Sequence, residues 1–589
     1  MNAREVAAVL EEIAMLGELT GENPFRIRAF AAAARTLEGT TADLEALARA
    51  GELASLPGVG PAIADTIAEL LATGRSGQHE RLRAEVPVGL YDLLRIPGLG
   101  TKRVRTLYAE RGIDSLDGLE AAARAGEVAA LPGFGPKTQQ KVLEGLGFVR
   151  ASAGRRRYPQ ALELAVHFLE WLRAHPAVAA AEIAGDVRRR METAAEVELV
   201  AAAPDPDAIV EAFLALQGAG GAAGRAGEGR AELRLRDGVR VRVRAVRPEA
   251  FVAAVAWETG SAAHLEALAA RAAERGLRLD ADGLRSGGEA VPLPDEEALY
   301  AALGLAYVPP ELREGMGEVA AAAEGRIPRL VELADLRGTF HCHTTWSDGK
   351  ATVAEMAEAA RERGWSYLGI ADHSRSAGYA GGLASTAVRA QHREIDAWNA
   401  EHGGAGAERF RLFKGTEADI LPDGSLDYPD AVLASFDYVV GSVHSSFAMP
   451  ERAMTERVLR AVENPRLTML GHPTGRLLLT REGYALDVRA VIDAAAAHGV
   501  AIEINADPHR LDLDWRWVRY AAERGVLVPV NPDAHSTRGL DNVAFGVNAA
   551  RKGWLSAPQV LNTRELQAVE EHLAQRKQGR APGADRPHP

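Results

Sequence analysis

The sequence has only one cysteine, no apolar run long enough to cross a membrane, and no overall excess of positive charge. The lone Cys342 excludes an internal disulfide and a cysteine-rich zinc module. A membrane-spanning helix needs about 20 consecutive apolar residues, and no stretch of this chain approaches that length. Glu11 and Glu12 also interrupt the apolar segment that a secretory signal would require. We therefore expect a cytoplasmic protein that has no membrane partner.

The chain is too long for one hydrophobic core, and its charge is unevenly distributed. A length of 589 residues predicts roughly three to five domains. Residues 158–335 hold 19 basic and 29 acidic residues, a net charge of −10 out of the total of −13. Any contact with nucleic acid is therefore expected to use small basic clusters rather than a basic surface.

A short pattern occurs three times within the first 150 residues. The copies read LPGVGPAIADTI from Leu56, IPGLGTKRVRTL from Ile96 and LPGFGPKTQQKV from Leu131. Each has a Pro-Gly-hydrophobe-Gly turn followed by helical periodicity, which predicts a helix, a tight turn and a second helix. The free N–H groups at the start of the second helix can bind an anion such as a DNA phosphate, without regard to sequence.

These repeats resemble helix-hairpin-helix DNA-binding motifs. The predicted DNA-binding residues are Gly58, Gly60, Gly98, Gly100, Lys102, Arg103, Gly133, Gly135 and Lys137. The first copy has no basic residue at its helix start. The alternative is three helical hairpins that only pack on one another. Arg26 and Arg28 add cations to an N-terminal helix, although a solvated helix face explains them almost as well.

The middle region contains three segments in a recognisable order. The segment from Ile183 to Ala203 reads as a strand, a glycine turn, a basic cluster and a second strand. Residues 238–246 alternate with period two, so that Arg240, Arg242 and Arg244 share one face of a strand. A turn and a helix follow from Trp257. Behind helix-hairpin-helix repeats, this order resembles the palm and thumb of bacterial family X DNA polymerases.

The resemblance includes departures at the catalytic positions. That family has Gly-Ser-x-Arg-Arg for the incoming triphosphate, an Asp-x-Asp motif on one strand and a third Asp on the next. Here Gly185, Arg188 and Arg189 match, whereas Asp186 stands at the serine position. Three further substitutions complete the set of departures: Glu196 and Glu198 replace Asp-x-Asp, and Arg242 stands at the third Asp.

Phosphoryl transfer by two metal ions explains why these departures matter. Carboxylates must hold two ions about 3.5–4 Å apart, and a displacement of about 1 Å can reduce the rate about 100-fold. Arg242 places a fixed positive charge there and can pair with Glu196 or Glu198. We expect a palm without a working polymerase site and without Mg²⁺. The alternatives are a weakened polymerase that uses other carboxylates, such as Glu192, and two ordinary solvated strand carboxylates.

Beyond Leu336 the chain alternates apolar strands with helical segments, which predicts a parallel βα fold. Seven strands recur about every 30 residues, and six of them end in His, Asp or Glu. In a parallel βα barrel these ends converge on one face. The predicted metal ligands are His341, His343, Asp348, His373, Glu417, His444, His472, Asp533 and His535. Imidazoles and carboxylates together suit Zn²⁺ or Mn²⁺.

This ligand set resembles, position by position, that of PHP (polymerase and histidinol phosphatase) domains. Nine ligands suit three metal ions, with carboxylates such as Glu417 as bridges, and the implied reaction is phosphoester hydrolysis. Asp372 is a candidate base. Arg476 and Lys350 are candidates to hold the phosphate, although ordinary surface charge explains Lys350 equally well. Cys342 is expected to be buried packing, and residues 507–509 are expected to form a loop.

The fold class that follows is a multidomain chain: a helical helix-hairpin-helix region, an α+β polymerase-like palm and thumb, and a C-terminal α/β PHP (βα)7 barrel. The expected boundaries are 1–82 for an 8-kDa-like helix-hairpin-helix domain, 83–150 for a fingers-like domain, 151–249 for the palm, 250–315 for the thumb, 316–335 for a linker, 336–577 for PHP and 578–589 for a disordered tail.

The whole chain resembles bacterial family X polymerases that carry a PHP domain. This resemblance implies a role in DNA repair and a Mn²⁺-dependent 3′→5′ exonuclease. We expect a metal-dependent DNA exonuclease that binds gapped, nicked or 3′-end structures without sequence preference, as a monomer. Alternatives are an active gap-filling polymerase with PHP exonuclease, a small-molecule phosphatase, and a repair scaffold in which the metals are structural. The repeats favour DNA over a metabolite.

Overall fold

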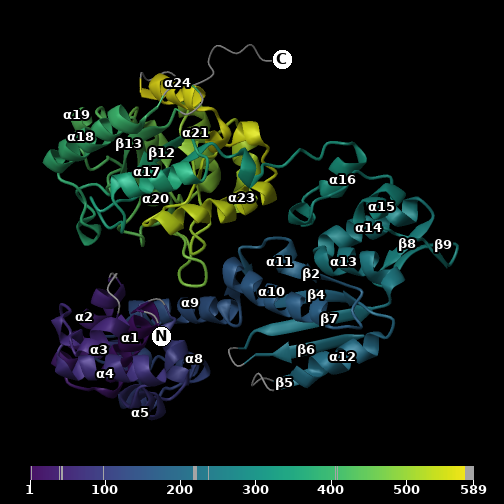
Figure 1. The fold of residues 1–589 in the computed structure, drawn as a ribbon, viewed down its shortest axis with the longest axis horizontal. Helices are drawn as coiled ribbons and strands as arrows, with labels where there is room; N and C mark the ends of the chain where they lie inside the picture. The colour runs from purple at the N-terminus through teal and green to yellow at the C-terminus, as the bar shows by residue number, and fades with distance from the viewer. Residues whose placement is uncertain are drawn as a thin grey trace. The chain divides into compact units, whose positions relative to one another are not determined.

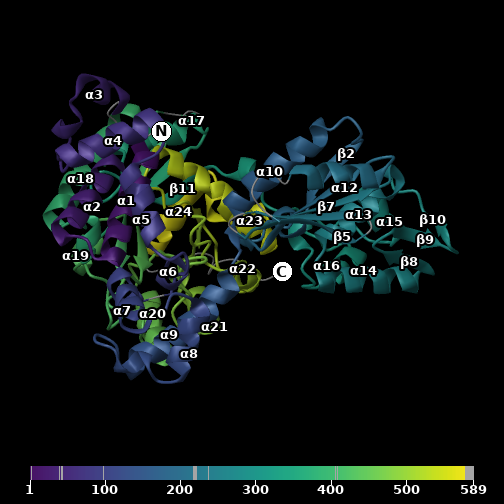
Figure 2. The same ribbon diagram turned by 90° about the horizontal axis from the view of Figure 1, so that it is seen from below.

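The computed structural model describes residues 1, 3–38, 40, 44–96, 98–216, 222–227, 229–235, 238–404, 406 and 409–577 (Figures 1 and 2). The chain forms two compact units, Met1–Ala153 and Gly154–Pro589, each of which is described by itself. The expected disordered tail, 578–589, lies outside the described residues. No described helix has the length and apolar character needed to cross a bilayer.

The first unit is helical. Its helices are α1 (Ala3–Thr20), α2 (Pro24–Glu38), α3 (Leu44–Ala50), α4 (Pro61–Thr73), α5 (Gly77–Glu85), α6 (Gly89–Leu94), α7 (Thr101–Arg111), α8 (Leu116–Arg124) and α9 (Pro136–Ser152), with 3₁₀ turns η1 (Leu53–Ser55) and η2 (Val128–Ala130). Leucine, isoleucine, valine and alanine side chains from all these helices form one core. The apolar spacing of each helix explains this, because one face of each is buried.

The palm has a five-stranded sheet in the order β2-β4-β7-β6-β5. Its elements are β1 (Arg156–Arg157), α10 (Tyr158–Ala174), β2 (Ala180–Ala184), α11 (Gly185–Arg188), β3 (Thr193–Ala194), β4 (Glu196–Ala202), α12 (Pro206–Leu214), β5 (Ala222–Gly227), β6 (Arg230–Arg234) and β7 (Arg240–Val246). Helices α10 and α12 cover one face of the sheet. On the other face, Val200 packs against Ala254 and Val255. Alternation therefore places Glu196 and Glu198 on that second face.

The thumb follows the palm sheet directly. Its elements are η4 (Pro248–Ala250), α13 (Phe251–Thr259), α14 (Ala262–Glu274), β8 (Leu277–Asp280), β9 (Gly283–Ser286), β10 (Glu289–Ala290), α15 (Glu296–Ala302), η5 (Pro310–Leu312), α16 (Glu318–Ala323) and η6 (Leu333–Asp335). Residues 316–335, expected as a linker, instead contain α16. Ala321, Ala322 and Leu330 are buried in the thumb core, because this alanine-rich segment is apolar on one side.

The C-terminal region is built on a curled parallel sheet, with strands in the order β11-β12-β13-β14-β15-β16. The strands are β11 (Gly338–Cys342), β12 (Tyr367–Ile370), β13 (Arg411–Asp419), β14 (Tyr438–Ser442), β15 (Met469–Leu470), β16 (Ala501–Ile502), β17 (Ile504–Asn505) and β18 (Val530–Asn531). β17 pairs with β18, and a parallel bridge joins Cys342 of β11 to Ala534 just beyond β18. The first and last strands of the sheet are thereby brought together, as a barrel requires.

Helices surround this sheet (Figure 1). They are α17 (Val353–Glu362), α18 (Ser385–His402), α19 (Asp430–Leu433), α20 (Glu451–Glu463), α21 (Val488–His498), α22 (Trp515–Glu523), α23 (Val543–Lys552) and α24 (Leu566–Lys577), with 3₁₀ turns η7 (Gly378–Ala380), η9 (Thr537–Asn542), η10 (Ala557–Gln559) and η11 (Leu561–Thr563). Inward side chains such as Phe340 and Phe413 pack with Leu566 and Leu573 of α24. Buried Cys342 belongs to the core between sheet and helices. These features confirm the predicted multidomain α/β fold class.

Candidate metal centre and DNA-binding elements

Nine side chains from six strand ends and their loops form one cluster in the C-terminal region. They fall into four overlapping groups of three or four residues, in each of which the ligand atoms lie within 4.8 Å of one another. The groups contain His343, Asp348, His373 and His535; His341, His472 and Asp533; His341, His343 and Glu417; and His373, Glu417 and His444. Each of the nine residues singled out in the sequence belongs to at least one group. They share a common rim because parallel strands end on the same side of the sheet.

Glu417 lies at the centre of this cluster. Its Oε1 atom is 2.9 Å from Nε2 of His472 and 3.2 Å from Nε2 of His444, and its Oε2 atom is 2.9 Å from Nδ1 of His373. Glu417 is 1% exposed, whereas Asp348 and His535 have side chains that are 35% and 37% exposed. The cluster is therefore closed at Glu417 and open to solvent beside Asp348 and His535.

The backbone at three of these residues is in the left-handed region. His341, His472 and Asp533 have φ values of 56°, 22° and 51°. Residues other than glycine adopt this conformation only where the surrounding structure compensates for the strain, typically at functional sites. The sheet thus turns these three side chains toward the common rim at an energetic cost.

Two further carboxylates orient the histidines, and sequence reasoning did not identify them. Glu503 is fully buried, and its Oε2 atom is 2.8 Å from Nδ1 of His341. Asp419 holds Nδ1 of His444 at 2.6 Å. Carboxylates of this kind fix the ring orientation of metal-binding histidines. The available signal for Glu503 was a lone acidic residue within the apolar strand segment from Val500 to Asn505.

The electrostatic environment pushes the histidine pKa values apart. Burial, followed by the charge of His535, lowers the pKa of His343 to about 4. Burial also opposes the protonation of His444, but Glu417 and Asp419 raise its pKa to about 10. Burial alone would raise the pKa of Glu417, yet the charges of His444 and His341 hold it well below the usual range. The central carboxylate is therefore ionised and available as a ligand.

Several ring nitrogens in the cluster are buried and make no hydrogen bond of good geometry, although oxygens of Glu417 and Asp533 lie 2.9–3.3 Å from three of them. The nitrogens concerned are Nε2 of His341, both ring nitrogens of His343, Nδ1 of His373 and Nδ1 of His472. Buried polar atoms are nearly always hydrogen-bonded, and leaving one unpaired costs about 1–3 kcal/mol. A group of unpaired imidazole nitrogens around an ionised carboxylate fits divalent cations better than a hydrogen-bonded core.

The structure places the predicted base Asp372 outside the four groups of potential ligands. Its carboxylate accepts hydrogen bonds from the backbone N–H and hydroxyl of Thr344, from the hydroxyl of Ser347 and from the amide of Gln391. With these donors around it, Asp372 fixes the loop that carries His343 and Asp348. Sequence adjacency to His373 suggested a site residue, but successive side chains of a strand point in opposite directions.

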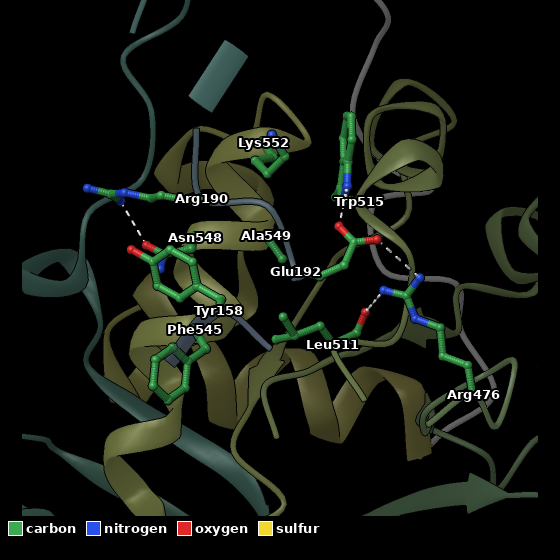
Figure 3. A pocket seen from close by; sticks show the side chains of 10 residues that line it. All are labelled: Tyr158, Arg190, Glu192, Arg476, Leu511, Trp515, Phe545, Asn548, Ala549 and Lys552. Atoms are coloured by element: carbon green, nitrogen blue, oxygen red, sulfur yellow. Dashed lines mark hydrogen bonds and ion pairs between the residues drawn. The ribbon is translucent and has the colours of Figure 1, made fainter. Parts of the chain in front are cut away.

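Arg476 also lies away from the cluster, at a small pocket between the palm and the PHP region (Figure 3). Its guanidinium donates to the carbonyls of Arg510 and Leu511 and to the carboxylate of Asp514, the last at 2.6 Å. These bonds use all three nitrogens. Arg476 is therefore held as a structural cation, and its position directly after His472 in sequence was misleading.

Glu192 lies in the same pocket. Its carboxylate accepts a hydrogen bond from Nε1 of Trp515 at 2.7 Å (Figure 3). It accepts another from Arg516 at 3.1 Å. A second contact across this junction is a hydrogen bond from Arg190 to Asn548. Glu192 thus joins the palm to the PHP region and is not available as a substitute polymerase carboxylate.

A different arginine reaches the metal cluster. Nε of Arg510 lies 3.8 Å from Oδ2 of Asp533, and its side chain is 21% exposed. Among the described residues, no other carboxylate pairs with Arg510. It is therefore better placed than Arg476 to meet a phosphate at the cluster. Lys350, the other candidate, contributes its backbone N–H to the carbonyl of His535.

In the palm, the carboxylate face of β4 is occupied by arginines. Glu196 pairs with Arg240 and Arg242, each at 2.9 Å, and Arg242 also pairs with Glu232 at 2.9 Å. The register explains these contacts, because β4 and β7 pair Glu196 with Arg240 and Glu198 with Arg242. The pairing of Arg242 with Glu196, which the sequence suggested, is present.

Glu198 differs from its neighbour because no ion pair holds it in the described structure. Burial, with the nearby charges of Glu196 and Glu258, raises the pKa of Glu198 to about 7. It lines a cavity of about 340 Å³ together with Arg242, Arg244 and Glu258. Gly185 adjoins this carboxylate, since a side chain on Gly185 would collide with Glu198. The carboxylate is therefore packed beneath the glycine turn.

The two arginines of the triphosphate-like motif bind carboxylates of the thumb. Arg188 makes a bidentate pair with Glu296, at 2.6 and 3.0 Å. Arg189 pairs with Glu314 at 3.0 Å and with Asp186 at 2.5 Å. These side chains are largely buried, with 11–25% exposure. An incoming triphosphate would have to displace these partners, because arginine donors bound to carboxylates are not free.

The three hairpins of the first unit have matching turns. Gly58, Gly98 and Gly133 have φ values of 77°, 84° and 78°, which glycine adopts without strain. The second glycines, Gly60, Gly100 and Gly135, are the N-caps of α4, α7 and α9. Of the predicted cations, Lys102 and Lys137 are exposed, whereas Arg103 is half-buried and donates to the carbonyl of Gly98. The geometry is that of helix starts that can bind an anion.

Comparison with known protein families supports this organisation. Residues 1–76 match the helix-hairpin-helix domain family, and residues 90–147 match the SAM-like helix-hairpin-helix tandem family. Residues 254–314 match the DNA polymerase beta thumb, and residues 339–507 match the PHP domain. PHP domains are metal-dependent, which agrees with the clustered His, Asp and Glu side chains. The helix-hairpin-helix and thumb matches indicate DNA binding.

Among individual relatives, one matches nearly the whole chain and others match about a third of it. The DNA polymerase/3′-5′ exonuclease PolX of Bacillus subtilis is 38% identical over 579 residues, which cover 97% of this chain and 99% of that protein. A probable phosphatase of Caldicellulosiruptor saccharolyticus is 32% identical over 206 residues, which cover 33% of this chain and 78% of the relative. The chain therefore belongs to the family X DNA polymerases (PolX) that carry a C-terminal PHP domain, which confirms the resemblance drawn from the sequence.

Proposed function

We propose that this protein is a metal-dependent 3′→5′ exonuclease and phosphoesterase that acts on DNA through its PHP cluster. The observation that carries the proposal is the convergence of nine potential ligands with unpaired, buried imidazole nitrogens. The Bacillus subtilis relative is named DNA polymerase/3′-5′ exonuclease PolX, which supports this direction of cleavage.

The nine side chains suit three divalent ions, either Mn²⁺ or Zn²⁺. When bound, such ions supply Lewis-acid chemistry to a phosphodiester and activate water. The oxygens of Glu417 lie 2.9–3.8 Å from ring nitrogens of His341, His343, His373, His444 and His472, so its carboxylate could be a ligand to more than one ion. Glu503 and Asp419 orient His341 and His444. Arg510, in place of the predicted Arg476, lies where it can hold a phosphate oxygen beside Asp533.

We further propose that the palm does not work as a polymerase site and holds no Mg²⁺. Glu196 is bound by two arginines, and Arg242 occupies the position of a metal ligand. Arg188 and Arg189 are bound by Glu296 and Glu314. Removing a metal ligand and occupying the triphosphate arginines both act against phosphoryl transfer.

DNA is the proposed partner, held at gaps, nicks or 3′ ends without sequence preference by a monomeric chain. The hairpin turns with exposed Lys102 and Lys137 support phosphate binding. A repair role follows from this combination of a non-specific DNA-binding region with an exonuclease.

The decisive test uses a 5′-labelled primer on a template, incubated with Mn²⁺ with and without deoxynucleotides. We expect shortening of the primer in the wild type, and its loss in His341→Ala and His343→Ala. Shortening that persists in both variants would refute the proposed active site. Templated extension by the wild type that disappears in the double variant Glu196→Ala/Glu198→Ala would show that the palm is an active gap-filling polymerase.

The same assay separates the remaining alternatives. A small-molecule phosphatase would release phosphate from simple monoesters and leave the primer intact. A scaffold with structural metals would bind the primer–template without cleaving it or a generic phosphodiester. Either result would contradict the exonuclease proposal.

A further inference from the structure

An open groove of about 210 Å³ is lined by residues of the loops that follow His444 and His472. Phe447, Arg481, Glu482 and Tyr484 are among the lining residues. Gly475, three residues after His472, donates its N–H to the carbonyl of His472 and accepts a hydrogen bond from Arg481 at 2.7 Å. The groove is therefore anchored to the backbone that carries two of the proposed metal ligands.

The guanidinium of Arg481 is held in a fixed position by a stack of rings. It lies 4.4 Å above the ring of Phe447, which in turn stacks on Tyr484 at 6.0 Å with an interplanar angle of 12°. In the described part of the chain, Arg481 has no carboxylate partner. Its remaining N–H groups can therefore be offered to a phosphate, with little entropy lost because the side chain is already positioned.

A second arginine connects this groove to the metals. Arg510 lies 3.8 Å from Asp533, and its loop is joined to the loop of Arg481 by a hydrogen bond from the N–H of Leu478 to the carbonyl of His509. Two arginines on joined loops favour the binding of an anion with repeated charges. Most other arginines of the PHP region are paired with carboxylates, as Arg409 and Arg411 are with Glu570.

An exposed aromatic ring stands on another side of the cluster. Tyr379 is 73% exposed, and its ring lies 6.1 Å from that of His373 and 6.3 Å from that of His444. It belongs to the short 3₁₀ turn η7, so no strand or long helix covers it. A large exposed ring next to a buried charged cluster is a stacking surface for a base, because every base has a π face.

We propose that Tyr379, Arg481 and Arg510 form a binding rim for single-stranded polynucleotide at the PHP cluster. Tyr379 stacks on the base of the 3′-terminal nucleotide, Arg510 contacts the scissile phosphate, and Arg481 holds a phosphate further along the strand. The inference rests on the proposed exonuclease and assigns to these three residues the preference for a DNA strand over a simple phosphate ester. Alternating aromatic and cationic groups are the general means of holding single strands.

The test compares two substrates of the full-length protein in Mn²⁺: a 5′-labelled single-stranded oligonucleotide and bis(p-nitrophenyl) phosphate. For Tyr379→Ala we expect KM for the oligonucleotide to rise about tenfold, the effect of losing one stacked base. For Arg481→Ala we expect a several-fold rise and a weaker dependence of KM on salt. In both variants, kcat/KM for the oligonucleotide should fall relative to kcat/KM for bis(p-nitrophenyl) phosphate.

Two controls make the comparison sharp. Arg489→Ala removes a matched arginine–aromatic stack, Arg489 over Tyr520 at 4.4 Å in the helix layer, and should leave KM for the oligonucleotide unchanged. Tyr379→Phe keeps the ring and should restore the low KM.

The outcomes separate the rim from the proposed function. If wild-type protein cleaves neither substrate, or His343→Ala cleaves both as well as wild type, the exonuclease proposal fails. If wild type cleaves the oligonucleotide but Tyr379→Ala and Arg481→Ala match Arg489→Ala, the rim alone is refuted. An equal rise of KM for the oligonucleotide in Tyr379→Phe and Tyr379→Ala would also exclude base stacking.

Discussion

The palm and the PHP region both carry clustered carboxylates on their strands, yet the negative charge is balanced by different groups in the two regions. In the palm, Glu196 is neutralised by Arg240 and Arg242. In the PHP region, Glu417 is surrounded by imidazoles, several of which have unpaired nitrogens. A guanidinium carries a permanent charge and neutralises a carboxylate by itself. A neutral imidazole does not, but an imidazole and a carboxylate can bind the same cation.

This difference indicates which site is available for metal chemistry. Ion pairs between arginine and glutamate complete the palm face, so an added cation would meet fixed positive charge. The PHP cluster is incomplete as a hydrogen-bonded network, and its imidazoles and carboxylates could hold divalent ions. We therefore expect the carboxylates of the two regions to serve different functions, because their neighbours are arginines in the palm and histidines in the PHP region.

The largest expected effect is the loss of exonuclease activity in His343→Ala. His343 belongs to two of the four ligand groups, so its removal disturbs more than one metal position. We expect a fall of at least about 100-fold, beyond the range seen for residues that only orient ligands. Primer shortening and bound metal per chain measure it. His498→Ala, at an exposed histidine of α21, is the control, and equal activity of the two variants would contradict the model of the site.

Glu503→Gln should have the next largest effect. The glutamine retains one acceptor but not the charge that holds Nδ1 of His341 at 2.8 Å. Outer carboxylates of this kind contribute about 10–100-fold to metal affinity or activity. Titration of the metal-free protein with Mn²⁺ measures the change, and unchanged affinity would remove Glu503 from the metal centre.

In the palm, the pH dependence of stability distinguishes Glu198 from Glu196. Folding raises the pKa of Glu198 from 4.5 to about 7, so the native chain keeps a proton that the unfolded chain has lost. Stability therefore falls as pH rises from about 4.5 to 7, by up to about 3 kcal/mol. Glu198→Gln removes this penalty and should melt several degrees above wild type at pH 8 but not at pH 4.

Glu196→Gln is the matched control for this experiment. It breaks the pairs with Arg240 and Arg242, so its melting temperature at pH 8 should fall. The measurement is the apparent melting temperature of the unit that contains the palm. Shifts of the same sign in both variants would show that the two carboxylates have the same environment. That result would contradict the difference between the ion-paired Glu196 and the buried Glu198.

The smallest expected effect is that of Arg242→Ala on stability. Its guanidinium bridges Glu196 and Glu232, and its side chain is 38% exposed. Partly exposed pairs contribute about 1 kcal/mol or less, so thermal unfolding should shift by only a few degrees. Templated extension should remain absent, because one substitution does not restore the ligand geometry. Gain of extension would mean that Arg242 alone blocks the palm.

Strand-end residues could be predicted because their chemistry is local. His341, His373 and His472 follow apolar runs that predict strands, and parallel strands share an end. Glu503 was missed because it lies between β16 and β17, where only the packed barrel shows that it faces His341. Asp372 and Arg476 were misplaced because adjacency to a ligand does not determine which way a neighbouring side chain points.

The amino-acid sequence by itself determined the order of domains, the three hairpin turns and the types of ligand, because these follow from glycine positions, periodicity and residue chemistry. The tertiary structure decided which cations meet which carboxylates. That choice depends on strand register and on the packing of the palm against the PHP region, where Glu192 binds Trp515 across 323 positions of sequence. Such long-range pairings arise only when the fold brings distant strands and helices into contact.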